Sequence, residues 1–226
     1  MKYLSVLFSL FLFFPLSLGA QSADELLRQV SESLAKGSDD TAVSLFRQAT
    51  DASADRAEVF YWTAVDKGSA VAPRLTEVLA THYSRQRDYD KACLFYREYL
   101  KHHPTDVPAL TSCAEMYLLC GKEEEALALY EKALAVDVDN LQANIYLGNY
   151  YFLQAEKVRH RLDDDYKKLL SPTRMQYARY RNSLSDLLAG SYAKARDYLQ
   201  RVLRRFPSTE AARTLEKIKR MEGEMR

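Results

Sequence analysis

The feature that most constrains the fold is a pattern of small and aromatic residues that repeats every 34 positions. Ala92 and Ala126 are 34 residues apart, and a tyrosine follows each of them four positions later, at Tyr96 and Tyr130. Residues four apart lie on the same face of an α-helix, so each copy predicts a helix with a small and an aromatic residue on its packed face. A period of this length is typical of stacked helical repeats.

A second predicted helix precedes each of these helices and carries a small residue followed three positions later by tyrosine. The three pairs are Ala80 and Tyr83, Ala114 and Tyr117, and Gly148 and Tyr151. The small residue allows a neighbouring helix to come close. The tyrosine packs over it and can direct its hydroxyl to a polar edge.

The combined pattern resembles the tetratricopeptide repeat family, whose 34-residue pattern has Leu-Gly, then Tyr, Ala, an aromatic residue and Pro. The resemblance covers 73–106 and 107–140, with Val138 where proline is usual. A third match is split between 147–151 and 190–207. The resemblance implies an all-α fold, an α-solenoid of antiparallel helix pairs, because one pair alone cannot bury its apolar face.

The chain is therefore expected to divide into a leader, four repeats of unequal quality and a final helix. These parts are a signal peptide at 1–20, a degenerate repeat with an extra short helix at 21–72, repeats at 73–106 and 107–140, a split repeat at 141–207, and a C-terminal capping helix at 208–226.

The split repeat is about 35 residues longer than a normal repeat. No Gly or Pro interrupts the helical stripe before Ser171-Pro172, and a second stripe then runs to Gly190, where the ordinary repeat is expected to resume. We favour an antiparallel helical hairpin inserted at about 156–189 with Pro172 at its tip, which projects as an arm. The alternative is a degenerate repeat within the stack. The arm offers a second contact surface, or it braces the C-terminal helices.

In this family the first helix of each pair supplies most of the concave face. The resemblance therefore implies a partner-binding groove formed by exposed positions of three such helices. The candidate residues are Arg74, Glu77, Thr81, Arg85, Thr111, Ser112, Glu115, Leu119, Ile145, Asn149 and Phe152. The lysine and asparagine clamp that some relatives use for a C-terminal carboxylate is not matched, because Thr81 and Glu115 occupy the equivalent positions.

The first twenty residues have the layout of a secretory signal. Lys2 precedes an apolar run from Tyr3 to Leu16, and small residues then predict cleavage between Ala20 and Gln21. The run is shorter than the ~20 apolar residues that span a bilayer, so a retained membrane anchor is the less favoured alternative. The mature protein is expected to be exported and periplasmic or envelope-associated, without stable membrane insertion.

Charge is distributed unevenly along the remaining chain. Residues 21–155 carry 13 Lys and Arg against 21 Asp and Glu, whereas residues 156–226 carry 18 against 10. The balance argues against a dedicated nucleic-acid-binding protein, whose whole domain would be basic. The basic second half permits an acidic partner or an acidic membrane surface, and solvated helix faces are the plainer interpretation.

No motif for catalysis, metal binding or a cofactor is present. Asp163, Asp164 and Asp165 are consecutive helix residues that point about 100° apart and cannot converge on one ion. The three cysteines, at positions 93, 113 and 120, are expected to be buried apolar residues. Cys113 and Cys120 are ~10.5 Å apart along one helix, too far for a disulfide, and Cys93 could pair with Cys113 only if their helices pack suitably.

The sequence thus predicts a non-catalytic protein–protein interaction scaffold or adaptor of the bacterial cell envelope, which uses its groove and its arm. The alternative is a periplasmic binding module for a glycan or another envelope ligand. That module would use some of the 16 tyrosines, although most of them occupy positions expected in the core, and a glycan-binding shift that mapped to Tyr146 and Tyr150 would favour it.

Overall fold

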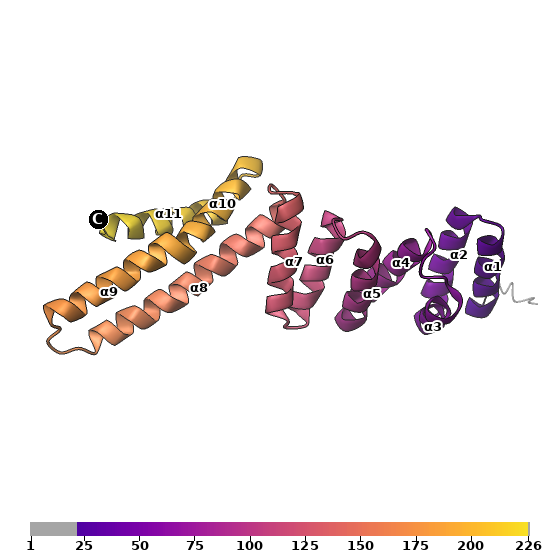
Figure 1. Cartoon of the computed structure of the whole chain (residues 1–226), viewed down its shortest axis with the longest axis horizontal. Coiled ribbons are helices and arrows are strands. Elements are labelled where there is room, and N and C mark those ends of the chain that lie inside the picture. Colours follow the sequence, from indigo (N-terminus) through magenta and orange to yellow (C-terminus); the bar gives the residue numbers. More distant parts are fainter. Residues whose placement is uncertain (1–21, 226) are drawn as a thin grey trace, which may run out of the picture. The chain divides into compact units, whose positions relative to one another are not determined.

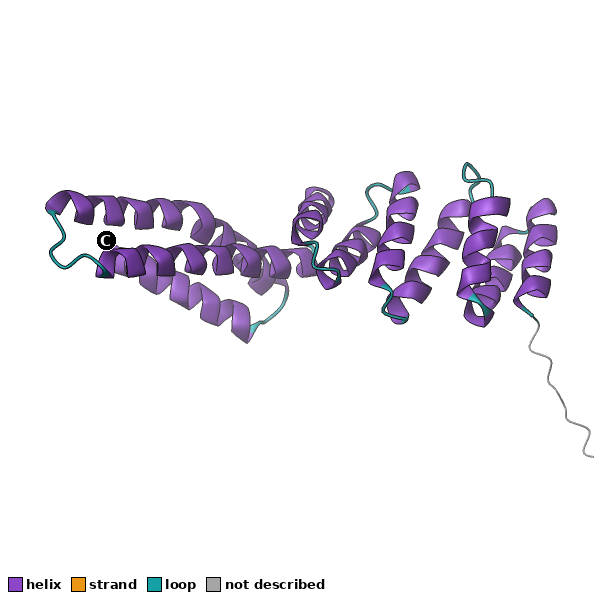
Figure 2. Ribbon diagram, turned by 90° about the horizontal axis from the view of Figure 1, so that it is seen from below, coloured by secondary structure: helices purple, strands orange, loops and turns teal. Residues whose placement is uncertain are grey.

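The computed structural model describes residues 22–225. The predicted signal peptide, with its cleavage between Ala20 and Gln21, lies outside the described residues. Within residues 22–225 every element is a helix and no strand occurs (Figure 2). No helix in this part of the chain combines the length and the apolar character that crossing a membrane requires.

The chain divides into two compact units, Met1–Asp66 and Lys67–Arg226. The described part of the first unit contains α1 (Ala23–Ala35), α2 (Asp39–Ala52) and α3 (Ala54–Ala64). Helices α1 and α2 pack as a pair, and α3 packs against both. Val30, Phe46 and Tyr61 are fully buried in this unit.

The second unit begins with two antiparallel helix pairs that stack side by side (Figure 1). Their helices are α4 (Ala72–Arg85), α5 (Tyr89–His102), α6 (Val107–Leu119) and α7 (Glu123–Val136). Four small residues of the repeat pattern are completely buried, namely Ala80, Ala92, Ala114 and Ala126. The predicted all-α solenoid of antiparallel helix pairs is confirmed.

The third helix pair is much longer than the first two. It consists of α8 (Leu141–Lys167), which faces an unbroken helix formed by α9 (Arg174–Leu187), the π-helix η1 (Leu188–Tyr192) and α10 (Ala193–Arg205). The first half of α8 packs against α10, and its second half packs against α9. The inserted residues therefore lengthen both helices of one pair. We call residues 156–187, which comprise the end of α8, the loop 168–173 and α9, the arm.

One feature of this pair differs from the sequence expectation. Gly190 was expected to be the point where an ordinary repeat resumes, but it lies inside η1 and the helix continues through it. A π-turn inserts extra residues without ending a helix, which explains why glycine marks no turn here. The chain then ends in α11 (Thr209–Met225), which buries Ala211 and Ile218 and exposes a charged face.

A chain of polar contacts runs along α8 and across to the facing helix. Within α8, Arg159 bridges Glu156 and Asp163 at 3.1 Å from each. The Tyr180 hydroxyl donates a hydrogen bond to Asp163 (2.8 Å), and the buried Tyr192 donates one to Glu156. Burial by itself would raise the pKa of Glu156, but the hydrogen bonds from Arg159 and Tyr192 outweigh it, and this pKa lies below its ordinary value.

Replacing Gly148 should test the close approach of α8 and α10. A Cβ atom at this position would lie 2.7 Å from Leu199 Cδ2 and 2.8 Å from Leu199 Cγ. We expect Gly148→Leu to destabilise the protein by about 1–3 kcal/mol or more, because overpacking forces the helices apart. The matched control is Gly223→Leu, at a helical glycine with nothing within 4 Å. Chemical denaturation followed by circular dichroism measures both. Equal stability of the two variants would contradict the packing of α8 on α10.

The turn inside each repeat provides a second test. Gly121 (φ 73°) and Arg87 (φ 63°) follow α6 and α4, 34 residues apart, and both adopt the left-handed conformation. The amide of the next residue closes each turn, as Lys122 N–H donates to the Tyr117 carbonyl at 2.9 Å. This conformation costs a residue with a Cβ roughly 1 kcal/mol. We therefore expect Arg87→Gly to raise the free energy of unfolding by up to about 1 kcal/mol and Gly121→Ala to lower it by a similar amount. Denaturation that showed the same sign for both changes would contradict this account.

The polar network of the arm should make stability depend on acid pH. Because the folded pKa of Glu156 lies below its ordinary value of 4.5, the carboxylate stabilises the fold above that pH. This contribution is lost as the pH falls through the folded pKa. We expect Glu156→Gln to cost about 1 kcal/mol or more at neutral pH, and the difference from wild type to shrink below pH 4.5. The control is Glu216→Gln, at an exposed position of α11, which should change little at either pH. A deficit independent of pH would refute the role of the carboxylate charge.

Candidate functional site

A first hollow opens between α4, α5 and α6. Its volume is about 310 Å³, and its lining residues are Glu77, Thr81, Tyr96, Tyr99, Asp106, Pro108, Ala109 and Ser112. Residues from the first helix of two successive repeats thus meet residues from the second helix of one repeat. The hollow exists because each helix pair leaves a recess where it meets the next pair.

The chemistry of this first hollow is that of hydroxyl groups and carboxylates. The Tyr99 hydroxyl donates a hydrogen bond to Asp106 Oδ2 (2.8 Å), while Asp106 Oδ1 caps α6 by accepting from the Ala109 amide (2.9 Å). Burial, with Asp106 nearby, raises the pKa of Tyr99 to about 12. The hydroxyl groups of Thr81 and Ser112 lie beside that of Tyr96. Such a surface mainly accepts hydrogen bonds and favours positive or N–H-bearing groups.

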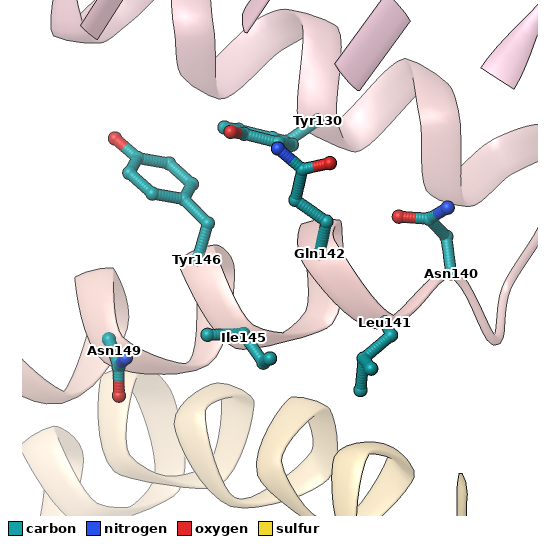
Figure 3. A pocket seen from close by; sticks show the side chains of 7 residues that line it. All are labelled: Tyr130, Asn140, Leu141, Gln142, Ile145, Tyr146 and Asn149. Atoms are coloured by element: carbon teal, nitrogen blue, oxygen red, sulfur yellow. The ribbon is translucent and has the colours of Figure 1, made fainter. Parts of the chain in front are cut away.

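A second hollow lies between α7 and the start of α8 (Figure 3). Its volume is about 610 Å³, and it is lined by Tyr130, Asn140, Leu141, Gln142, Ile145, Tyr146 and Asn149. Figure 3 shows Tyr130 reaching from α7 toward Gln142 and Tyr146 of α8. The rings of Tyr130 and Tyr146 stack with their centroids 4.5 Å apart, and burial raises the pKa of Tyr146 to about 12. Leu141 and Ile145 add exposed apolar surface.

The two hollows are the same structural feature in successive repeats. The lining positions that correspond after a shift of 34 residues are Tyr96 and Tyr130, Asp106 and Asn140, Pro108 and Gln142, and Ser112 and Tyr146. Glu115 of α6 contacts the second hollow, because Gln142 Nε2 lies 3.4 Å from its carboxylate. The position is conserved between repeats, while the chemistry changes: the carboxylate of Asp106 is replaced by the amide of Asn140, and the second hollow adds the apolar side chains of Leu141 and Ile145. We call the surface that carries both hollows the groove face.

The structure brings six of the predicted groove residues to the groove face. Glu77, Thr81 and Ser112 line the first hollow, and Ile145 and Asn149 line the second. Glu115 contacts Gln142 of the second hollow. These residues remain candidates for contact with a partner.

The other predicted residues lie elsewhere. Thr111 was expected to be exposed, but it is only 5% exposed, and its hydroxyl donates to backbone carbonyls of its own helix at 3.1 Å. Phe152 is half-buried and packs against Tyr192, in the core shared by α8 and η1. Arg74, Arg85 and Leu119 are exposed but line neither hollow. Helix faces rotate by about 100° per residue, so a position one step from the groove can point into the core.

Sequence reasoning missed the contribution of the second helix of each repeat. Tyr96 and Tyr130 were identified by their 34-residue spacing, but they were interpreted as core positions. Tyr130 is indeed buried, yet its ring edge also forms a wall of the second hollow. Tyr99, Asp106, Leu141, Gln142 and Tyr146 were not assigned to the groove face either. The sequence signal for this contribution was the recurrence of tyrosine at the same repeat position, at Tyr96 and Tyr130.

The described residues offer no grouping of three or more His, Cys, Asp or Glu side chains arranged to hold a metal ion. All three cysteines are free. Cys93 and Cys113 are buried, as expected. Cys120 is only half-buried because it is the C-cap residue of α6, at the end of the helix.

Comparison with known proteins agrees with this architecture. Models of the tetratricopeptide repeat match residues 75–108, 109–143 and 177–209. The third match covers most of α9 and all of η1 and α10, which form one continuous helix, so its partner helix in space is α8. No curated protein sequence gives a significant match.

The solved structures that match the chain include the following two. A crystal structure from Bacteroides ovatus, described as a "putative protein binding protein", is 52% identical, covers 91% of this chain and 100% of its own, and has a TM-score of 0.80. A tetratricopeptide repeat protein from Parabacteroides merdae is 19% identical, with coverage of 90% and 74% and a TM-score of 0.40. With successive repeat matches over stacked antiparallel helix pairs, the chain belongs to the tetratricopeptide repeat family.

Proposed function

We propose that the protein is a non-catalytic interaction scaffold or adaptor of the bacterial cell envelope that holds a segment of a partner protein on its groove face. The repeat family and the relative described as a protein binding protein support a protein ligand. The secretory pattern of residues 1–20 supports export to the periplasm or envelope.

The repeated hollow is the observation that carries this proposal. An extended polypeptide that lies across successive repeats meets one hollow per repeat. The first hollow, with Glu77 and Asp106, suits a lysine or arginine side chain or backbone N–H groups. The second, with Leu141, Ile145 and the tyrosine rings, suits an apolar or aromatic side chain. The expected partner segment therefore combines a basic residue with an apolar anchor.

Binding of a glycan or another envelope ligand is the second candidate. The amide side chains of Asn140, Gln142 and Asn149 beside tyrosine rings favour it, because sugars use amides and aromatic faces. However, the Tyr146 ring is stacked against Tyr130 at 4.5 Å and lies 6.1 Å from Tyr150. The ring surface left for a sugar is therefore small, and we favour the protein partner.

Substitution of Ile145 should test the groove face directly. Ile145→Arg places a positive charge in the second hollow, where the expected partner inserts an apolar side chain, so capture of the partner should fall at least about tenfold. The matched control is Val138→Arg, which also replaces an exposed β-branched apolar residue by arginine but lies outside the hollow (52% exposed, against 39% for Ile145). Affinity purification after chemical crosslinking in the source cells compares the two variants with wild type, and circular dichroism checks their folding.

Three outcomes distinguish the hypotheses. A single abundant partner captured by wild type and Val138→Arg but lost from Ile145→Arg supports the groove as the binding site. A partner retained by Ile145→Arg contradicts it. If no protein is captured while an envelope glycan binds wild type and not Ile145→Arg in calorimetry, the ligand-binding alternative replaces the scaffold.

A further inference from the structure

The tip of the arm exposes a group of large apolar side chains. The loop 168–173 joins α8 to α9 at the far end of the hairpin (Figure 1). Leu170 in this loop is fully exposed, Met175 is 65% exposed, and Leu169 and Tyr177 are also exposed. Isolated exposed apolar residues are common, but four within nine positions at the end of a hairpin form a patch.

The same tip is basic. Between Tyr166 and Ser185 the chain has five Lys and Arg residues and no Asp or Glu. Two of these charges are engaged, because Lys168 pairs with Asp165 at 2.9 Å and Arg181 donates to the backbone carbonyl of Glu224. Lys167, Arg174 and Arg179 are exposed near the apolar patch. Exposed leucine surrounded by cationic side chains is the composition that binds the interface of an anionic membrane.

The arm presents this tip on an ordered support. The rings of Tyr166 and Tyr180 stack with centroids 4.4 Å apart across the two helices. At the start of α9, Thr173 and Gln176 form a reciprocal capping box. The Gln176 backbone N–H donates to Thr173 Oγ1 (3.2 Å), and the Thr173 backbone N–H donates to Gln176 Oε1 (2.8 Å). The loop is thus fixed at both ends, and little conformational entropy is lost when its side chains insert into a surface.

We propose that the arm tip docks the protein on an anionic lipid bilayer. Leu169, Leu170 and Met175 enter the interfacial region, while Lys167, Arg174 and Arg179 lie among the headgroup phosphates. A lipid surface deforms around inserted side chains, so Leu170 can enter it without a preformed pocket. A protein partner would need a recess that matches Leu170. Contact through a short tip differs from insertion of a spanning helix. This proposal extends beyond the groove and does not rest on it.

Vesicle co-sedimentation tests the proposal with the chain that begins at Gln21, so that the apolar run of residues 3–16 contributes nothing. We expect binding to vesicles that contain phosphatidylglycerol, little binding to phosphatidylcholine alone, and weakening in high salt. Leu170→Glu should reduce the partition coefficient by about tenfold or more, the loss expected when one buried leucine is removed from the interface. Lys167→Glu should reduce it by about fivefold or more, since each cation near the surface contributes about that factor.

Matched controls place the same changes elsewhere on α8. Leu153→Glu alters a leucine that is 64% exposed. Lys157→Glu alters an exposed lysine about 15 Å along the helix axis from Lys167, which is farther than the Debye length of about 10 Å at 0.1 M salt. Both controls should bind vesicles like wild type. Circular dichroism confirms that all variants are folded.

Two results would overturn the proposal. One is the absence of binding to phosphatidylglycerol vesicles by wild type, and the other is binding that Leu170→Glu leaves unchanged. If a photo-crosslinker at position 170 captures an acidic protein in cells and vesicles do not bind, the tip is a protein-docking surface and the membrane assignment is wrong.

Discussion

Close approach of paired helices at small residues is the contact on which the rest of the second unit depends. Ala80, Ala114 and Gly148 occupy the same position in successive repeats, and each is buried. At Gly148 no side-chain atom could be added without meeting Leu199. This contact sets the spacing within each pair, and the spacing in turn creates the recess between one pair and the next. The two hollows of the groove face are consequences of that packing.

The third pair uses the same contact and then continues beyond it. Helix α8 carries Ile145 and Asn149 of the second hollow near its start and runs without a break to the base of the arm tip. The facing helix matches this length because η1 absorbs a local change of register without ending the helix. The hydrogen bonds from Tyr180 to Asp163 and from Tyr192 to Glu156 then join the lengthened helices. Helix α8 therefore connects the proposed partner site with the proposed membrane contact. Each of its residues adds about 1.5 Å to the distance between them along the helix axis.

The 34-residue period, with the family resemblance that rests on it, was sufficient to predict the fold class and the stacked pairs. It also pointed to a minority of the residues that line the hollows, namely Glu77, Thr81, Ser112, Ile145 and Asn149. It did not locate Thr111 and Phe152 correctly, because one residue step turns a helix position from the groove into the core. The tyrosines of the second helices were found by their spacing and assigned to the core. A large aromatic ring can pack in the core and still border a hollow with its edge, and periodicity alone does not distinguish these cases.

The sequence by itself determined the repeat, the helix pairs and the unusual length of the third pair, because these follow from local periodicity and from the absence of glycine and proline. The split match of 147–151 with 190–207 also anticipated the pairing of the first half of α8 with α10, a contact that joins residues about fifty positions apart. Tertiary structure alone decided two further points. It carried the helix through Gly190, because packing against α8 outweighs the weak helix propensity of glycine. It also set which side chains border the hollows and the arm tip, since exposure depends on neighbouring helices that no local pattern specifies.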